Sequence, residues 1–144
     1  MKFTVLPESW SPSLLSVLRI MAGLAFLEHG TGKLLNFPVL PGIADMMPHG
    51  LLVFTGAMEL VGGALIVVGF LTRPAAFVLA GFMAAAYFMA HFPMGFFPAN
   101  NHGEAALLYC FVFLYIAAAG AGPWSVDSAA FGRERSNAYP SPAE

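Results

Sequence analysis

The stretch GLLVFTGAMELVGGALIVVGFLTRPAAFVLAGFMAAAYFMAHF, residues 50–92, decides the fold class. Its only charged side chains are Glu59 and Arg73. A membrane-spanning helix needs about 20 mostly apolar residues, and the turn at Arg73 divides the stretch into two pieces of that length. Pro74 suits the first turn of a new helix. The stretch therefore predicts two transmembrane helices, over residues 50–71 and 74–92.

Two more segments of similar length flank this stretch. Residues 104–122 carry no charge after Glu104, and glycine and proline end the segment. Residues 13–35 form the other segment, which is unusual for a span because it contains four ionisable side chains: Arg19, Glu28, His29 and Lys33. The sequence therefore predicts four membrane-spanning helices.

The composition agrees with a membrane protein. Only 10% of the 144 residues are charged, against about 25% in an ordinary soluble domain. Hydrophobic residues make up 58%, which excludes a water-soluble enzyme of this size and a disordered chain. The net charge of -2 gives no basic surface for nucleic acid, and the single cysteine, Cys110, excludes an intramolecular disulfide. We expect one membrane domain over residues 1–144, with a polar tail at 123–144.

Four apolar helices with short loops predict an all-α fold, a transmembrane four-helix bundle that runs up-down-up-down. Positive side chains then gather on one side of the membrane, which holds Lys2, Arg73, Arg133 and Arg135, while Lys33 lies on the other side. The positive-inside rule therefore predicts that both termini are cytoplasmic. We expect a multi-pass protein of the cell's inner or plasma membrane.

Small residues follow one face of two of the predicted helices. At about 100° per residue, the second helix presents Thr55, Gly56, Glu59, Gly62, Gly63 and Ile66 on one face. The third helix does likewise with Ala76, Ala80, Ala84, Gly81 and Ala85. Such spacing is typical of membrane helices that approach each other closely.

The ionisable side chains within the spans are the main functional clues, because such groups normally pair or face a cavity. Glu59 and His29 are the catalytic candidates. The ligand-binding candidates are Arg19, His29, Lys33, Glu59, His91 and Glu104. Structural alternatives are open: Glu59 can pair with Lys33 or His29, Arg19 can bond carbonyls or Asp127, and Glu104 can stabilise a helix N-terminus.

Three motifs resemble those of one known family. The segment LRIMAGLAFLEHGTGKL, residues 18–34, resembles the first helix of the DoxX-like small four-helix membrane proteins. The segment MELVGGALIVVGFLTRPAA, residues 58–76, resembles their second helix and turn, and GEAALLY at 103–109 with GPWSVD at 122–127 resembles their last helix and terminal signature. The resemblance implies an oxidoreductase class in which some relatives are membrane subunits of thiosulfate:quinone oxidoreductase.

The residues and the resemblance leave several functions open. The first is a quinone-interacting or accessory subunit of a membrane redox system, with a soluble redox partner protein supplying electrons. The others are a non-enzymatic membrane scaffold subunit, a small proton or solute transporter, and haem ligation by His29 and His91. Quinone is the expected cofactor, and no metal is predicted. The bilayer surrounds the chain, which can form a homo-oligomer, and whether it is itself an enzyme stays open. Convergence of His29, Lys33 and Glu59 on an apolar cavity would favour ligand handling, and a dry ion pair would favour scaffolding.

Overall fold

The computed structural model describes residues 5–43 and 45–131, and this part of the chain is helical, without strands. The four main helices are α1 (Ser11–Leu35), α2 (His49–Val68), α3 (Thr72–Ala86) and α5 (Glu104–Ala119). The short elements are the 3-10 turn η1 (Glu8–Trp10), the π-helical turn η2 (Tyr87–His91), the 3-10 turn η3 (Phe92–Met94) and α4 (Pro98–Asn101).

Three helical segments are long and apolar enough to cross a membrane: Glu8–Leu35, His49–Val68 and Thr72–Met94. The fourth predicted span corresponds to α5, which has only 16 residues. At 1.5 Å per residue it is about 24 Å long, shorter than a hydrocarbon core of about 30 Å. An all-helical membrane protein is thus confirmed, while the up-down-up-down order and the cytoplasmic termini stay predictions. Lys2, Arg133 and Arg135 lie outside the described residues.

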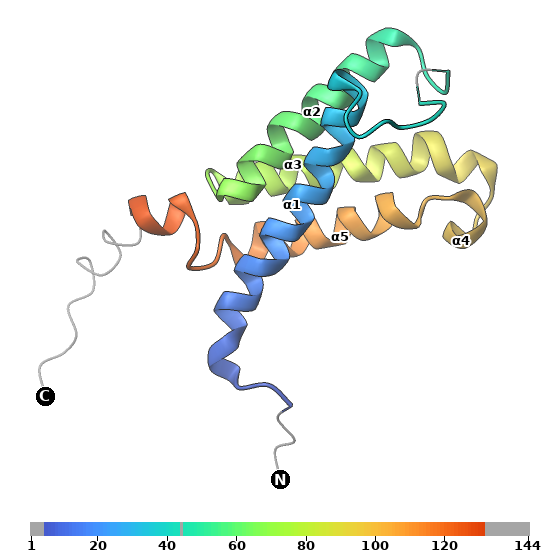
Figure 1. The fold of residues 1–144 in the computed structure, drawn as a ribbon. Helices are drawn as coiled ribbons and strands as arrows, with labels where there is room; N and C mark the ends of the chain where they lie inside the picture. The colour runs from blue at the N-terminus through green and yellow to red at the C-terminus, as the bar shows by residue number, and fades with distance from the viewer. Residues whose placement is uncertain (1–4, 44, 132–144) are drawn as a thin grey trace, which may run out of the picture.

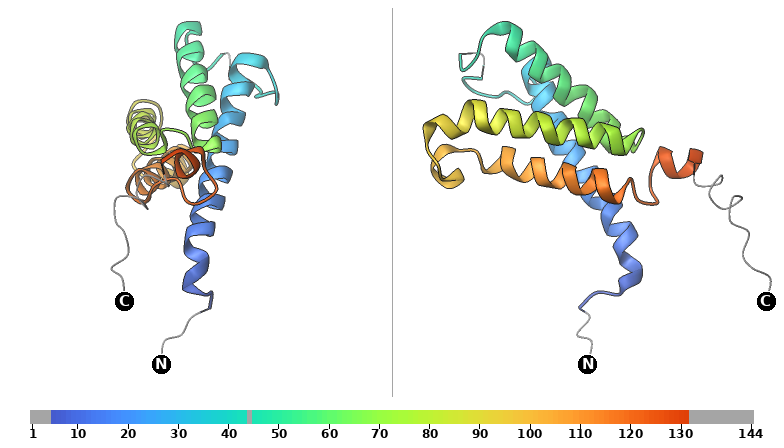
Figure 2. Two further views of the ribbon diagram at one scale, coloured as in Figure 1. Left: turned by 90° about the vertical axis from the view of Figure 1, so that its left-hand side faces the viewer. Right: turned by 180° about the vertical axis from the view of Figure 1, so that it is seen from behind.

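The main helices form two antiparallel hairpins, one of α1 with α2 and one of α3 with α5. Figure 1 shows α1 running across α3 and α5. In the left view of Figure 2 the α3–α5 hairpin is seen almost end-on, whereas α1 and α2 run up the picture. The hairpins therefore cross, and α3 has α5 as its main partner although α2 precedes it in the chain.

Glycines bring α1 and α2 into close contact. A Cβ added to Gly30 would overlap the backbone nitrogen of Leu60, and one added to Gly63 would lie 2.8 Å from the Cα of Leu27. The buried residues of α2 are Leu52, Gly56, Glu59, Gly62, Gly63 and Ile66. This buried face of α2 agrees with the face that the spacing of small residues predicts.

Replacing Gly30 with alanine is expected to lower the free energy of unfolding by about 1–3 kcal/mol, because the new methyl group overpacks against the backbone of α2. The matched control is Gly81→Ala in α3, where an added Cβ meets nothing within 4 Å. That change is expected to be neutral or to stabilise the helix by up to about 1 kcal/mol. Thermal unfolding in detergent, followed by circular dichroism, compares the variants. Equal melting temperatures would contradict the close approach.

The hydrophobic core lies where the two hairpins cross. Phe26 of α1 contacts Phe113 of α5 edge-on, with ring centroids 5.0 Å apart, and Tyr109 at 5.4 Å. Ile66 of α2 and Leu79 of α3 complete the centre and are fully or almost fully buried. Aromatic contacts of this kind stabilise the fold beyond the contribution of the apolar surface that they bury.

The segment after α5 packs back on α1 at the start of that helix. The Trp124 backbone N–H donates to Ser16 Oγ at 3.2 Å, and residues 126–131 form a further helical turn. Residues 123–131 belong to the tail that the sequence predicts, and in the structure their first part is held by hydrogen bonds. Residues 132–144 lie outside the described part.

Candidate functional site at the α1–α2 ion pair

Lys33 and Glu59 form a salt bridge between α1 and α2. Lys33 Nζ lies 2.7 Å from Glu59 Oε1, and the two side chains are only 9% and 7% exposed. Lys33 also donates to Thr55 Oγ1 at 3.3 Å. Gly56 makes room for this arrangement, because a Cβ there would meet the Cβ of Lys33 at 3.1 Å. The close helix packing thus places a cation and a carboxylate in hydrogen-bonding contact inside the protein.

The second carboxylate oxygen of Glu59 is the distinctive feature of this pair. Glu59 Oε2 is buried, and within residues 5–43 and 45–131 it has no hydrogen-bond partner. His29 and Tyr109 interact with Glu59 electrostatically. A buried carboxylate oxygen without a donor is costly, so this atom is available to accept a further hydrogen bond.

Two other candidates, His29 and Glu104, do not join this pair. His29 is exposed, although it interacts electrostatically with Glu59. Glu104 is exposed at the first residue of α5, where a carboxylate suits the positive end of the helix dipole. The structure therefore brings together Lys33 and Glu59, with His29 at the periphery.

His91 belongs to a separate polar network at the tip of the α3–α5 hairpin. Its Nδ1 lies 3.0 Å from the backbone oxygen of Asn101. Asn101 is fully buried, donates to the Gly95 carbonyl at 2.7 Å and accepts from the Gly103 N–H at 2.8 Å. Sequence reasoning missed Asn101, although an Asn two residues before a Gly is a typical turn-forming pattern.

Arg19 is fully buried at the other end of α1, 14 residues and about 21 Å along the helix from Lys33. Its guanidinium donates to four carbonyls: Ile66, Val67 at 2.6 Å, Ala121 at 2.7 Å and Trp124. The first two carbonyls belong to the last turn of α2, which lacks donors of its own. Arg19 thus caps α2 and holds the segment that follows α5.

Asp127 and Arg73 complete the connections at this end of the molecule. The Asp127 carboxylate accepts from the backbone N–H groups of Leu71 and Thr72, each at 2.9 Å, where α3 begins. Arg73 donates to the Ala118 carbonyl at 2.6 Å and so caps α5. Arg19, Arg73 and Asp127 therefore bind backbone groups, whereas the unpartnered Glu59 oxygen lies in the other half.

These features define an all-helical membrane protein with a buried ion pair, and comparison with known proteins gives its family. The DoxX family model matches residues 14–92, which include Arg19, Lys33 and Glu59. The chain belongs to the DoxX family. It is similar to an uncharacterized protein of Haemophilus influenzae (strain ATCC 51907 / DSM 11121 / KW20 / Rd), with 41% identity over 128 residues, 86% of this chain and 96% of the relative. No solved structure matches the chain.

Proposed function

We propose that this protein is a membrane-embedded accessory subunit of a redox system that binds a quinone at the Lys33–Glu59 pair. The observation that carries the proposal is Glu59 Oε2, a buried acceptor without a partner in the described part of the chain, next to a buried ammonium group. Ionisable groups within membrane spans commonly mark ligand or proton pathways.

The pair has the chemistry that a quinone headgroup requires. Reduction of a quinone to a quinol adds two electrons and two protons to its two oxygens. The Lys33 ammonium can polarise one quinone oxygen. Glu59 can take up a proton from water and pass it to that oxygen, and as a carboxylate it can then accept a hydrogen bond through Oε2 from the quinol hydroxyl; the second proton comes from water. The electrons come from a partner redox protein, because this chain carries one cysteine and no flavin-binding motif.

Aromatic side chains of the core, one of which interacts electrostatically with Glu59, suit a flat ring. Tyr109, which interacts with Glu59 electrostatically, lies 5.4 Å from the ring of Phe26 between centroids. Phe82 contacts the same Phe26 ring edge-on at 6.4 Å. Offset or edge-on contacts with such rings are favourable for a planar headgroup.

The proposal predicts that Glu59→Gln weakens quinol binding at least about tenfold, because the neutral amide is a weaker acceptor for the quinol hydroxyl than the carboxylate and keeps the size of the side chain. The probe is decylubiquinol, the reduced form, titrated calorimetrically into the purified full-length protein. The control is Glu28→Gln, which alters an exposed carboxylate on α1 and is expected to leave binding unchanged.

Two results would contradict the quinone proposal: no binding by the unmodified protein across the titration, or equal affinity in a folded Glu59→Gln variant. Circular dichroism of each variant shows whether it is folded. An equal loss of binding in Glu59→Gln and in the control Glu28→Gln would show that the effect is not specific to Glu59.

A scaffold subunit is the second candidate, and the direct Lys33–Glu59 contact at 2.7 Å favours it. In this case the pair joins α1 to α2 and has no ligand. Removing the charges then alters the stability of the protein without altering any quinone affinity, so the same titration separates the two functions.

A further inference from the structure

One face of α1 is exposed along the membrane-spanning part of the helix. Figures 1 and 2 show α1 crossing one side of the α3–α5 hairpin, so that its outer side is open. Five residues of this face are exposed: Leu14, Leu18, Met21, Ala25 and Glu28. They follow one another at alternate steps of four and three residues, which is the spacing along which two helices pack side by side. We call these five residues the α1 seam.

Glu28 is a carboxylate on a face that otherwise suits lipid. It lies within the membrane-spanning segment Glu8–Leu35, about 10 Å before the end of that segment. Side chains lean toward the N-terminus of their helix, so the Glu28 carboxylate leans toward the membrane interior. In the part of the chain that the structure describes, this carboxylate makes no hydrogen bond or salt bridge, and Tyr109, which interacts with it electrostatically, carries no positive charge. A carboxylate within the membrane normally has a partner, which here requires a group from another chain.

We infer that the α1 seam is an interface between two copies of this chain, in which Glu28 of each copy pairs with His29 of the other. His29 is exposed beside Glu28 and also interacts electrostatically with Glu59. Copies in one membrane share their orientation, so their α1 helices run parallel, and Glu28 of one copy lies within about 1.5 Å of the depth of His29 of the other. A two-fold axis along the membrane normal forms both pairs at once, because a contact in an isologous interface occurs twice.

A second copy is favoured over lipid and over an unrelated subunit because this face carries both halves of the pair. The carboxylate of Glu28 can accept a hydrogen bond from an imidazole N–H, and the bond is stronger when either group is charged. In a parallel pair of helices a seam residue also contacts the residue that follows its counterpart on the other helix, and His29 follows Glu28. The small side chain of Ala25 lets the two backbones approach closely next to the pairs.

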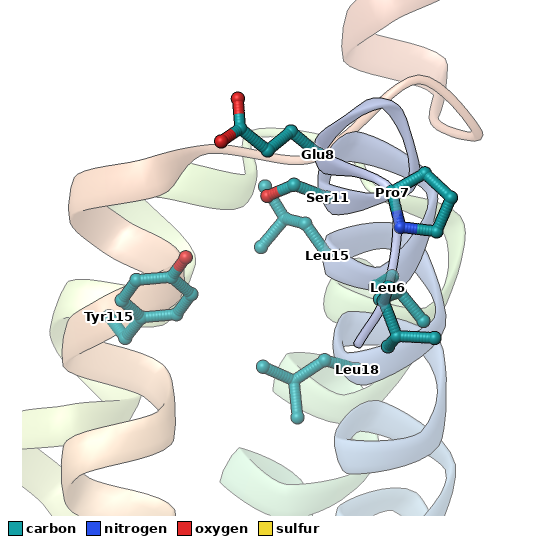
Figure 3. A pocket seen from close by; sticks show the side chains of 8 residues that line it. Leu6, Pro7, Glu8, Ser11, Leu15, Leu18 and Tyr115 are labelled. Atoms are coloured by element: carbon teal, nitrogen blue, oxygen red, sulfur yellow. The ribbon is translucent and has the colours of Figure 1, made fainter. Parts of the chain in front are cut away.

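A hollow beside the seam gives the second copy further surface to pack against. A pocket of about 430 Å³ lies between the beginning of α1 and α5, and its lining includes Leu14, Leu18 and Tyr115. Figure 3 shows the Tyr115 ring facing Leu15 and Leu18 from α5. Apolar side chains of the second α1 can enter this hollow next to the seam, and van der Waals packing of this kind drives the association of helices in lipid.

The interface goes beyond the proposed quinone site and does not depend on it. Lys33 and Glu59 meet between α1 and α2 within one copy, whereas the α1 seam lies on another face of α1. The dimer is therefore expected without quinone, and its measurement does not use one. A failure of the quinone titration would leave the interface unaffected, and the reverse also holds.

The first test is sedimentation equilibrium of the purified full-length protein in density-matched detergent. We expect the unmodified protein to form a dimer, and Glu28→Leu and His29→Leu each to raise the dissociation constant about tenfold, because either change removes both pairs. The exchanged variant, Glu28→His with His29→Glu, is expected to recover the original dissociation constant, since it forms the two pairs with their partners reversed. The control is Glu104→Leu, which removes an exposed carboxylate outside the seam and is expected to have no effect.

Disulfide trapping in membranes tests where the two copies meet. In a Cys110→Ser background, Met21→Cys is expected to form a disulfide-linked dimer under mild oxidation, because the two copies of a central seam residue face each other. Phe77→Cys is the control, since Phe77 of α3 is 66% exposed but lies outside the seam, and it is expected to stay unlinked.

Three results would overturn the interface: an unmodified protein that is monomeric, trapping as strong at Phe77→Cys as at Met21→Cys, or an unchanged dissociation constant in both leucine variants. Circular dichroism shows whether each variant is folded. A folded exchanged variant that dimerises no better than the leucine variants would overturn the pairing of Glu28 with His29.

Discussion

Replacing Arg19 with methionine is expected to lower the free energy of unfolding by about 5 kcal/mol, the largest effect of any single change proposed for this protein. Methionine is apolar and of similar length, so the change removes the guanidinium without opening a large cavity. Four carbonyls then lose their donor at once, and hydrogen bonds to charged groups contribute about 1.5–3 kcal/mol each. Non-additivity keeps the total below the sum.

Thermal unfolding in detergent and the amount of protein in membranes both measure this effect. The matched control is Arg73→Met, which removes a guanidinium that also binds carbonyls of a last helical turn but is exposed. Its loss is expected to cost about 1 kcal/mol, because water can solvate the carbonyls it leaves. An Arg19→Met variant as stable as Arg73→Met would show that the buried bonds do not hold the fold together.

Replacing Lys33 alone with methionine is expected to cost about 3–5 kcal/mol, since it leaves the Glu59 carboxylate buried without its cation. Replacing both partners, Lys33→Met with Glu59→Leu, is expected to recover most of this stability. An apolar pair of similar volume has no desolvation penalty, and such exchanges are often neutral or stabilising.

Melting temperatures of the two single variants and the double variant form a double-mutant cycle. A double variant whose loss of stability equals the sum of the two single losses would show that the pair is not coupled. The same double variant also separates the proposed functions, because it is expected to be folded. If the protein is a scaffold, the double variant still assembles with its complex. If it is a quinone-binding subunit, the double variant loses its quinone affinity.

The local pattern of the sequence predicts much of the fold. Helix α2 was predictable from its apolar length, and its buried face from the spacing of Gly56, Glu59 and Gly63, because a helix repeats every 3.6 residues. The turn before Pro74 was predictable for a similar local reason. Pairing of Glu59 with Lys33 was one of two open alternatives, since both helices carry their charges toward the same end.

The crossing of the two hairpins was not predictable in this way. Short loops indicate which helices lie side by side, but not the angle at which one hairpin crosses another. That angle depends on the shapes of side chains such as Phe26 of α1 and Phe113 of α5, which meet at the crossing. The network around Asn101 was missed because it depends on a short turn. The partners of Arg19 were not identifiable because they are backbone carbonyls, which no side-chain pattern marks.

The bonds of Arg19 also bear on how the chain is made. Ala121 and Trp124, which supply two of its acceptors, lie 102 and 105 residues after it. At about 5–20 residues per second, a ribosome adds the later residues roughly 5–20 s after Arg19. During that interval the first helix holds an arginine that still lacks half of its final acceptors. Insertion of this helix is thus provisional until the segment after α5 has been synthesised, and a chain that stops at the end of α5 would retain that defect.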